Sequence, residues 1–428
     1  MPAPELIDAL RERQFRLLWL GQATSSLGNG LVPVALAFAV LDLTGSATDL
    51  GLVLMAQTLP LVAFLLVGGV WADRLPRQLV MVSSDVIRGG SQAVAAVLLV
   101  TGRAELWHLI AIAAAFGTAE AFFQPAYTGL VPATVSASRL QQANALLGLS
   151  SSAAFIVGPA LAGVLIAVGG TWVAFTVDAA TFAVSAASLL AMRLPALKRP
   201  AERTNFLADL AGGWRELVSH TWLWVIILWA TTYLFVVVAP FFVLGPLIAK
   251  ESLGGASAWA TIATAWGIGA LLGGALALRW KPERPMVACC ALVLVEAIPL
   301  SLLALRAPVL AIAGAQLFGG LAMGFFMAVW TTTLQQHIPE DKLSRVSAYD
   351  WMGSLAFLPL GYALAGPVAA WIGVSTTLWI SVAWVLISTV AVLAVPGVRR
   401  LRRKEPSPPQ AEAALPATLE PAEALSAR

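Results

Sequence analysis

The sequence predicts an all-α membrane protein of twelve transmembrane helices, arranged as two pseudo-symmetric bundles of six. Three observations support this prediction. Of the 428 residues, 59% are hydrophobic and only 11% are charged, whereas soluble domains have roughly 45–50% and about 25%. The apolar residues also fall into runs long enough to cross a bilayer, and the second half of the chain repeats spacings of the first. An ordinary soluble fold is therefore excluded.

The apolar runs give the individual spans. A helix needs about 20 mostly apolar residues to cross the hydrocarbon core, and windows of about 19 residues find twelve such runs. The predicted spans are 16–41, 49–71, 79–101, 105–125, 143–168, 172–193, 221–249, 257–279, 286–306, 309–334, 346–371 and 375–396.

Two longer connections divide the chain. We predict an N-terminal six-helix bundle over 1–193, a cytoplasmic central loop over 194–220, a C-terminal bundle over 221–396 and a cytoplasmic tail over 397–428. The tail begins with basic residues and continues with Pro, Ala and Glu without an apolar period. Such composition cannot bury enough apolar surface to fold, so the tail is predicted to be disordered.

The distribution of Lys and Arg gives the orientation. An even number of spans places both termini on one side, and most of the 26 Lys and Arg residues lie on that side. Only Arg103, Lys250 and Arg306 lie in connections on the other side. Cytoplasmic connections carry an excess of these residues. The sequence therefore predicts a multi-pass protein of the plasma membrane with both termini in the cytoplasm.

The two halves of the chain share a repeat. GPALAG at 158–163 is matched by GYALAG at 361–366, and the same offset places Gly117 on Gly320. One match between small residues in membrane helices means little, but a constant offset across several spans indicates two related halves. Two such bundles enclose a central site and rock about it in many transporters.

The connection between the second and third spans carries the pattern G-x-x-x-D-R-x-x-R, filled by Gly69, Asp73, Arg74 and Arg77. A glycine such as Gly69 lets helices approach closely. Asp73 would lie near the N-terminus of the eleventh span, whose partial positive charge favours a carboxylate by roughly 0.3–1 kcal/mol. We therefore predict a conformational latch between the halves on the cytoplasmic side.

Arg77 can complete this latch by pairing with a carboxylate. Glu120 and Asp350 lie near the inner ends of the fourth and eleventh spans and are the two choices. The latch would hold the cytoplasmic side closed and must open for the site to face inward, which makes it a two-state element. In the alternative interpretation, Arg74 and Arg77 only fix the topology.

With these residues in view, the chain resembles the major facilitator superfamily, whose members carry this signature between helices two and three. Further stretches resemble its branch of proton-driven drug, macrolide and siderophore exporters. These are FRLLWLGQATSSLGNG at 15–30, LDLTGSATDLG at 41–51, SDVIRG at 84–89, AEAFFQPA at 119–126 and SAYDWMGSLAFLPLGYALAGP at 347–367. The resemblance implies a transporter that works by alternating access, without a cofactor and as a monomer.

Ionisable residues inside the predicted spans mark functional candidates, because each costs about 2.5–3.5 kcal/mol to insert. Glu120, Asp178, Glu296 and Arg88 are candidates for proton coupling or substrate binding. A carboxyl group in a low-dielectric cavity can exchange a proton near neutral pH. The alternatives are structural: Arg88 pairs with Asp85 on its own helix, and each acidic residue only hydrogen-bonds between helices.

The GPALAG stretch in the fifth span resembles the antiporter signature of that helix. Gly158 and Gly163 permit close helix packing, and Pro159 frees a backbone carbonyl. The match is partial. The fourth span also lacks the arginine-containing motif of many drug/proton antiporters, so these residues predict a packing motif first and antiport second.

The sequence thus predicts a secondary transporter that exports amphipathic drugs or metabolites by proton antiport. Its partners would be a small amphipathic molecule, protons and the lipid bilayer. Solute uptake or lipid translocation by the same fold is the alternative, followed by a membrane sensor or a membrane-embedded enzyme. No phosphate-binding G-x-x-x-x-G-K motif or Cys/His cluster is present, so neither ATP hydrolysis nor a metal is expected. The net charge of only +3 does not indicate nucleic acid.

Overall fold

The computed structural model describes residues 8–193 and 214–404, without the side chains of residues 65–74, 340–341 and 344. Within these residues the chain is helical and contains no strand. Eleven helices are long and apolar enough to cross a membrane. The remaining predicted span is the 24-residue helix α4 (Arg77–Val100), in which buried polar side chains interrupt the apolar sequence. The predicted fold class is confirmed.

The N-terminal bundle follows a short 3-10 helix, η1 (Asp8–Arg11). Gly45 ends its first long helix in the left-handed region at φ 67°, where its N–H donates to the Leu41 carbonyl. The bundle contains α2 (Arg13–Thr44), α3 (Ala47–Arg74), α4, α5 (Leu106–Leu130), α6 (Leu140–Gly169) and α7 (Thr171–Leu190), with the 3-10 turns η2 (Val131–Ala133) and η3 (Ala137–Arg139) between α5 and α6.

The C-terminal bundle has more interrupted helices. Its first span is continuous but includes two π-helical segments. The elements are α9 (Thr221–Tyr233), η4 (Leu234–Val238), α10 (Ala239–Ile248), η5 (Ala249–Leu253), α11 (Ala256–Arg279), α12 (Pro285–Val293), η6 (Leu294–Glu296), α13 (Ala297–Ala304), α14 (Val309–His337), α15 (Glu340–Leu355), α16 (Leu358–Ile372), α17 (Val374–Ala394) and α18 (Pro396–Arg399).

The π segment η4 has an identifiable cause. Pro240 has no N–H, so it cannot donate to the carbonyl four residues earlier, that of Val236. The Ser381 hydroxyl on α17 donates to this carbonyl at 2.6 Å. The irregular turn is therefore joined to a neighbouring helix, as membrane-buried backbone requires.

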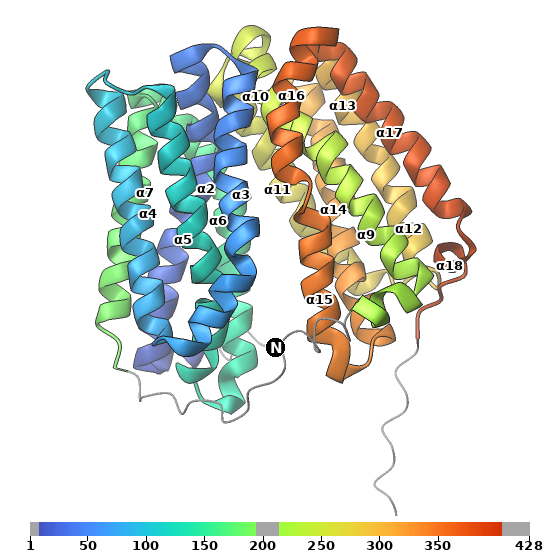
Figure 1. Cartoon of the computed structure of the whole chain (residues 1–428), viewed down its shortest axis with the longest axis horizontal. Coiled ribbons are helices and arrows are strands. Elements are labelled where there is room, and N and C mark those ends of the chain that lie inside the picture. The colour runs from blue at the N-terminus through green and yellow to red at the C-terminus, as the bar shows by residue number, and fades with distance from the viewer. Residues whose placement is uncertain (1–7, 194–213, 405–428) are drawn as a thin grey trace, which may run out of the picture.

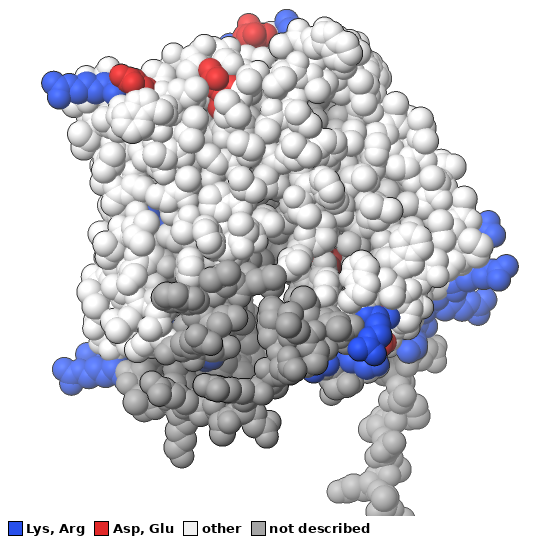
Figure 2. Space-filling model, viewed as in Figure 1, with Lys and Arg blue, Asp and Glu red and all other residues white. Residues whose placement is uncertain are grey.

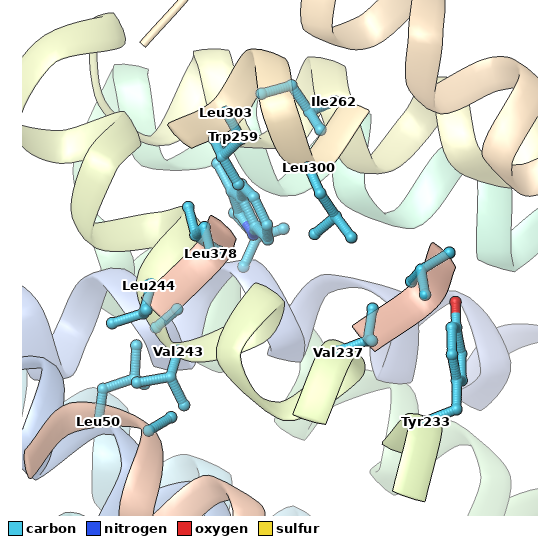
Figure 3. Packing of buried hydrophobic residues seen from close by; sticks show 14 of the residues in the cluster. Leu50, Tyr233, Val237, Val243, Leu244, Trp259, Ile262, Leu300, Leu303 and Leu378 are labelled. Atoms are coloured by element: carbon cyan, nitrogen blue, oxygen red, sulfur yellow. The ribbon is translucent and has the colours of Figure 1, made fainter. Parts of the chain in front are cut away.

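Apolar side chains lie on both the inside and the outside of the molecule. Figure 3 shows Trp259 packed with Leu300, Leu303 and Leu378 in the C-terminal core. On α4 several large apolar residues face outward, and Val86 is 60% exposed. Asp85 beside it is 1% exposed. This inverted arrangement suits a lipid environment, where polar groups need the protein interior.

The two bundles meet at one end and diverge at the other (Figure 1). Contacts between them run along α3 with α16 and α6 with α11. At these crossings glycines face the opposite bundle: Gly51 lies against the Tyr362 carbonyl, and Gly366 lies against the backbone of Thr48. A Cβ atom has no room at either position, so the halves touch through their backbones.

An ion pair spans the same end of the molecule. Lys250 of η5 donates to the Leu41 carbonyl at the end of α2 and to Asp42 Oδ1, both at 2.6 Å. The ammonium also interacts favourably with the negative end of the α2 dipole. We call this contact, from Lys250 to Leu41 and Asp42, the outer clamp, after the side on which the orientation predicted from the sequence would place it.

Basic side chains gather at the opposite end. Figure 2 shows Lys and Arg along the lower edge of the molecule, below a broad uncharged band. We call this the basic edge; it includes Arg139, Arg279, Lys281 and Arg399. Helix α2 begins there, and α18 lies there as well (Figure 1).

Two contacts fasten connecting segments to the basic edge. Glu216, in the helical segment 214–219 of the predicted central loop, accepts from Lys342 on α15 at 2.8 Å. This hydrogen bond holds the pKa of Glu216 below its usual range. In the predicted tail, the Arg403 N–H donates to the Glu283 carbonyl at 2.9 Å. The tail beyond residue 404 lies outside the described residues.

Candidate functional site

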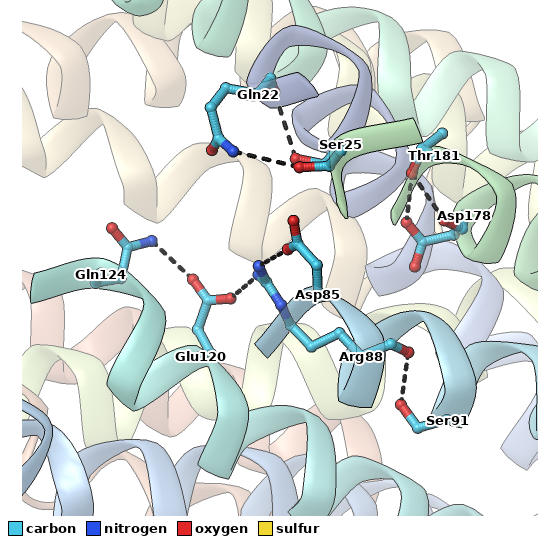
Figure 4. Close-up of polar contacts among 10 residues, drawn as sticks. Gln22, Ser25, Asp85, Arg88, Ser91, Glu120, Gln124, Asp178 and Thr181 are labelled. Carbon is cyan, nitrogen blue, oxygen red and sulfur yellow. Dashed lines mark hydrogen bonds and ion pairs between the residues drawn. The ribbon is translucent and has the colours of Figure 1, made fainter. Parts of the chain in front are cut away.

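A charged cluster lies inside the N-terminal bundle, centred on Arg88 of α4. The Arg88 side chain is 1% exposed. Its Nη2 donates to Asp85 Oδ1 at 2.6 Å, and its Nη1 donates to Glu120 Oε2 on α5. Figure 4 shows the guanidinium between the two carboxylates. The i,i+3 spacing on α4 brings Asp85 to Arg88, and the packing of α4 on α5 supplies Glu120.

Aromatic rings enclose the guanidinium. Its central carbon lies 4.1 Å from the ring centroid of Phe123, 4.6 Å from that of Phe182 and 5.8 Å from that of Phe116. Ring faces attract cations, and more strongly where water is excluded. Arg88 is therefore held by two carboxylates and by an apolar cage from α5 and α7.

Glu120 and Arg88 both line a cavity, and Glu120 is the more exposed of the two. The Glu120 side chain is 20% exposed, and its Oε1 accepts from Gln124 Nε2 at 2.7 Å. The cavity has a volume of about 170 Å³. Its lining residues are Gln22, Ala23, Ser25, Ser26, Asn29, Arg88, Glu120, Phe123, Gln124, Tyr127, Leu147, Ser150 and Ser151. We call it the polar cavity.

A second cavity of about 520 Å³ continues from the polar cavity. The two share Tyr127, Leu147 and Ser151 as lining residues. The second is also lined by Val131 and Leu140, which lie where α5 ends and α6 begins, near the basic edge. The two cavities together form a route from the basic edge to Glu120.

The walls of the polar cavity differ in chemistry. Gln22, Ser25, Ser26 and Asn29 on α2 offer hydroxyl and amide groups, while Phe123 on α5 offers an aromatic surface. Binding sites for small molecules combine a largely apolar wall with a few polar groups that fix orientation. The polar cavity reverses this proportion, because only Ala23, Phe123 and Leu147 of its lining are apolar. It can therefore bind the polar part of an amphipathic molecule and a smaller apolar surface.

Asp178 and Glu296 lie elsewhere, and neither lines the two cavities. Asp178 is fully buried on α7 beside Thr181. Glu296 is 5% exposed, at the end of η6 in the C-terminal bundle, where the Trp266 indole donates to it. The structure therefore joins Glu120 and Arg88 in one cluster and separates Glu296 from them.

The predicted latch residues are not joined in the described contacts. The sequence left Glu120 and Asp350 as partners of Arg77, but Glu120 pairs with Arg88. Arg77 Nη1 donates to the Gly129 carbonyl at 2.6 Å, within its own half. Asp350 Oδ2 accepts from Trp330 Nε1 at 2.9 Å, also within its own half.

The remaining latch residues, Gly69, Asp73 and Arg74, lie in the last turns of α3. Their side chains lie outside the described residues. The bundles meet at the end opposite the basic edge (Figure 1).

The predicted packing motif lies at two close crossings. A Cβ on Gly158 would come within 2.5 Å of Gly30 Cα on α2. A Cβ on Gly163 would come within 2.7 Å of Ala260 Cβ on α11, across the two bundles. Pro159 is accommodated inside α6. These glycines thus allow the contact within the bundle and the contact between bundles.

The sequence reasoning missed the amides of the site. Gln22, Gln92 and Gln124 were not among the predicted site residues, yet all three lie at or beside the charged cluster. A signal was available, because Gln92 follows Asp85 and Arg88 on one face of α4 at helical spacing. A polar stripe on a predicted membrane span points to the protein interior.

Comparisons with known proteins show which family has this architecture. Residues 18–354 match the model of the Major Facilitator Superfamily. Macrolide efflux protein A of Streptococcus pyogenes is 25% identical over 91% of this chain and 97% of its own length. The multidrug efflux pump Tap of Mycolicibacterium fortuitum is 27% identical over 90% of this chain and 96% of its own.

Solved structures share the fold at low sequence identity. A point mutant of the nucleoside transporter NupG superposes with a TM-score of 0.74 at 13% identity, covering 89% of this chain and 99% of its own. A bacterial homologue of the lysosomal transporter Spinster, inward-facing and unoccupied, gives 0.70 at 15% identity and covers 93% and 99%. The predicted resemblance is confirmed, and the chain is a multi-pass transporter and not an enzyme. It belongs to the major facilitator superfamily.

Proposed function

We propose that this transporter exports amphipathic small molecules in exchange for protons. The observation that carries the proposal is Glu120, a carboxylate bound to the buried Arg88 and exposed to a cavity with polar and aromatic walls. Two relatives, a macrolide efflux protein and a multidrug efflux pump, support export. Uptake or lipid translocation by the same fold remains the alternative.

The proposed orientation puts the basic edge and both termini in the cytoplasm of a cell bounded by the plasma membrane. The excess of Lys and Arg at that edge supports it. The closed end then faces outward, so the conformation is inward-facing, like that of the solved Spinster homologue. The halves 1–193 and 221–396 would rock about the cavities as two bodies.

The proposed coupling acts through the charge of Glu120. When ionised, Glu120 is held by Arg88 and Gln124 and closes the wall of the cavity. A proton on Glu120 removes the attraction to Arg88, frees the side chain and changes what the cavity can bind. A proton entering through about 100 mV releases about 2.3 kcal/mol, which can drive the export step.

Efflux from energised cells tests the function. We expect cells that express the protein to extrude a macrolide or a lipophilic cationic dye, and a protonophore to stop extrusion. Glu120→Gln should remove the protonophore-sensitive part, because the amide cannot exchange a proton. Glu251→Gln is the matched control, since Glu251 is 49% exposed and pairs with Arg306 at the outer end.

Two outcomes would contradict this proposal. Unchanged protonophore-sensitive efflux in Glu120→Gln would exclude that residue as the coupling group. Absence of extrusion for every compound, with the protein present in the membrane, would favour uptake or lipid translocation.

We also propose that Gly69, Asp73, Arg74, Arg77 and Asp350 form a latch when the basic edge closes. Asp73→Asn should slow efflux severalfold without lowering the amount of protein in the membrane, since a carboxylate at a helix N-terminus contributes up to about 1 kcal/mol. Efflux rates normalised to membrane-inserted protein provide the measurement. Full efflux by this variant would leave Arg74 and Arg77 with a topological role only.

A further inference from the structure

Asp178 is a buried acidic residue to which the proposed function gives no role. It lies in the middle of α7 and is 0% exposed. The backbone of α2 covers it, because a Cβ on Gly28 would collide with Asp178 Oδ1 and Thr181 Oγ1. Figure 4 shows its carboxyl group apart from the Arg88 cluster, next to Thr181.

The carboxyl group of Asp178 receives little stabilisation as an anion. The Thr181 hydroxyl donates to the Asp178 backbone carbonyl at 2.7 Å and lies 3.3 Å from Asp178 Oδ1. A hydroxyl has one hydrogen, so Oδ1 has at most a share of it. Asp178 Oδ2 is buried and has no partner among the described residues. A buried ionised carboxylate needs several donors or a cation in contact.

No cation among the described residues is in contact with Asp178. The charged groups that face it are Arg88 and Asp85 on α4 and, behind them, Glu120 on α5. Neither α2 nor α6 contributes a charged side chain at this level in the described residues. Both Nη atoms of Arg88 already bind Asp85 and Glu120. One guanidinium thus faces three carboxyl groups, and Asp178 is the one that it does not bind.

Gln92 on α4 can complement either form of this carboxyl group. Its amide N–H can donate to the ionised Asp178 carboxylate, while its Oε1 is buried without a partner among the described residues. A proton on Asp178 Oδ2 would give the carboxyl a donor for this acceptor. Because an amide offers both a donor and an acceptor, Gln92 can turn to suit either protonation state.

We propose that Asp178, with Gln92, forms a second proton-binding site between α2, α4 and α7. The proton satisfies Asp178 Oδ2 and Gln92 Oε1 together and removes an uncompensated buried charge. The claim that this proton takes part in transport rests on the proposed proton antiport. The claim that the site binds a proton does not.

A polar path connects this site to the cavities. Within the part of the chain that the structure describes, Asp85 Oδ2, Arg88 Nε and Gln92 Oε1 are all buried without partners, on successive turns of one face of α4. Buried polar atoms of this kind are commonly satisfied by ordered water. Water at these positions would carry protons between Glu120, at the cavity wall, and Asp178.

Infrared spectroscopy of the purified protein tests the site without any substrate. A protonated carboxyl group gives a C=O band distinct from that of a carboxylate, and the band shifts in D₂O. We expect such a band near neutral pH in the native protein and in the Glu251→Gln control, and its loss in Asp178→Asn. A band that is unchanged in Asp178→Asn, or absent from the native protein, would overturn the proposal.

A second variant removes the hydrogen-bond partner. Gln92→Leu should keep the band and move it to higher frequency, because the protonated carboxyl loses its acceptor. An unmoved band in Gln92→Leu would contradict the pairing of Asp178 with Gln92. The spectra should also be compared in sodium chloride and choline chloride. Loss of the band in sodium alone would mean that the site takes a metal cation in place of the proton.

Transport then separates this proposal from the proposed function. Asp178→Asn should retain downhill exchange of substrate and lose accumulation driven by a proton gradient. If the band is assigned to Asp178 and the protein nevertheless shows no proton-driven transport, the proposed antiport fails while the proton site stands. If antiport is intact and the band does not arise from Asp178, the proton site fails while the proposed antiport stands.

Discussion

Replacing Arg88 with methionine should abolish transport and destabilise the protein by about 3–5 kcal/mol, the usual cost of removing one partner of a buried ion pair. The substitution leaves Asp85, itself 1% exposed, without the cation that it binds. It also frees Glu120. Thermal unfolding in detergent, followed by tryptophan fluorescence, and the efflux assay measure the two effects.

A double variant separates folding from function. Arg88→Met combined with Asp85→Asn removes the buried unpaired charge, because Glu120 can reach the cavity and exchange its proton there. Most of the lost stability should return while transport stays absent. Arg88→Lys should be intermediate, since one ammonium cannot bind two carboxylates in the planar geometry of a guanidinium. Full transport by Arg88→Met would show that the cluster has no part in the mechanism.

The second large effect is expected at the outer contact between the bundles. Gly366→Leu should prevent the outer end from closing, because the new side chain would occupy the space of the Thr48 backbone. The protein should remain open to the outside, and transport should fall by at least tenfold. Gly314→Leu is the matched control on α14, where a Cβ meets no atom within 4 Å.

Distances between spin labels measure this opening. Leu43 and Ser252 lie in different halves near the outer clamp, and both can be changed to cysteine. Cys289 and Cys290 are free and buried, and replacing both by alanine gives a clean background. Gly366→Leu should lengthen the distance between the labels relative to Gly314→Leu. Equal distances, together with normal efflux, would show that this glycine contact does not control closure.

The sequence was sufficient for the fold. Spans were predictable because each must cover the same hydrocarbon thickness, and the repeat indicated two bundles. The interruptions of the helices within these spans were less predictable. The eleventh predicted span, 346–371, falls on α15 and α16, which are separate helices, with Pro359 in the first turn of the second. The ninth, 286–306, contains a 3-10 turn that ends at Glu296.

The site was predictable only in part. The spacing of Asp85 and Arg88 indicated a pair on one helix, and the structure contains that pair. Glu120 was predicted only as one choice for Arg77, whereas the structure pairs it with Arg88, because periodicity within one helix does not give its rotation against the next. The cavities also depend on that rotation, so their lining from α2, α5 and α6 appears only in the structure.

The outer clamp has a consequence for how the protein is studied. Its members are exposed to solvent, with Lys250 33% and Asp42 58% accessible, so dissolved ions screen their attraction. An exposed pair contributes about 0.2–1 kcal/mol, which is enough to shift a balanced equilibrium severalfold. The inward-facing state and the state open to the outside should therefore be populated differently in dilute buffer and in saline. Transport rates measured at different ionic strengths would then belong to different mixtures of the same molecule.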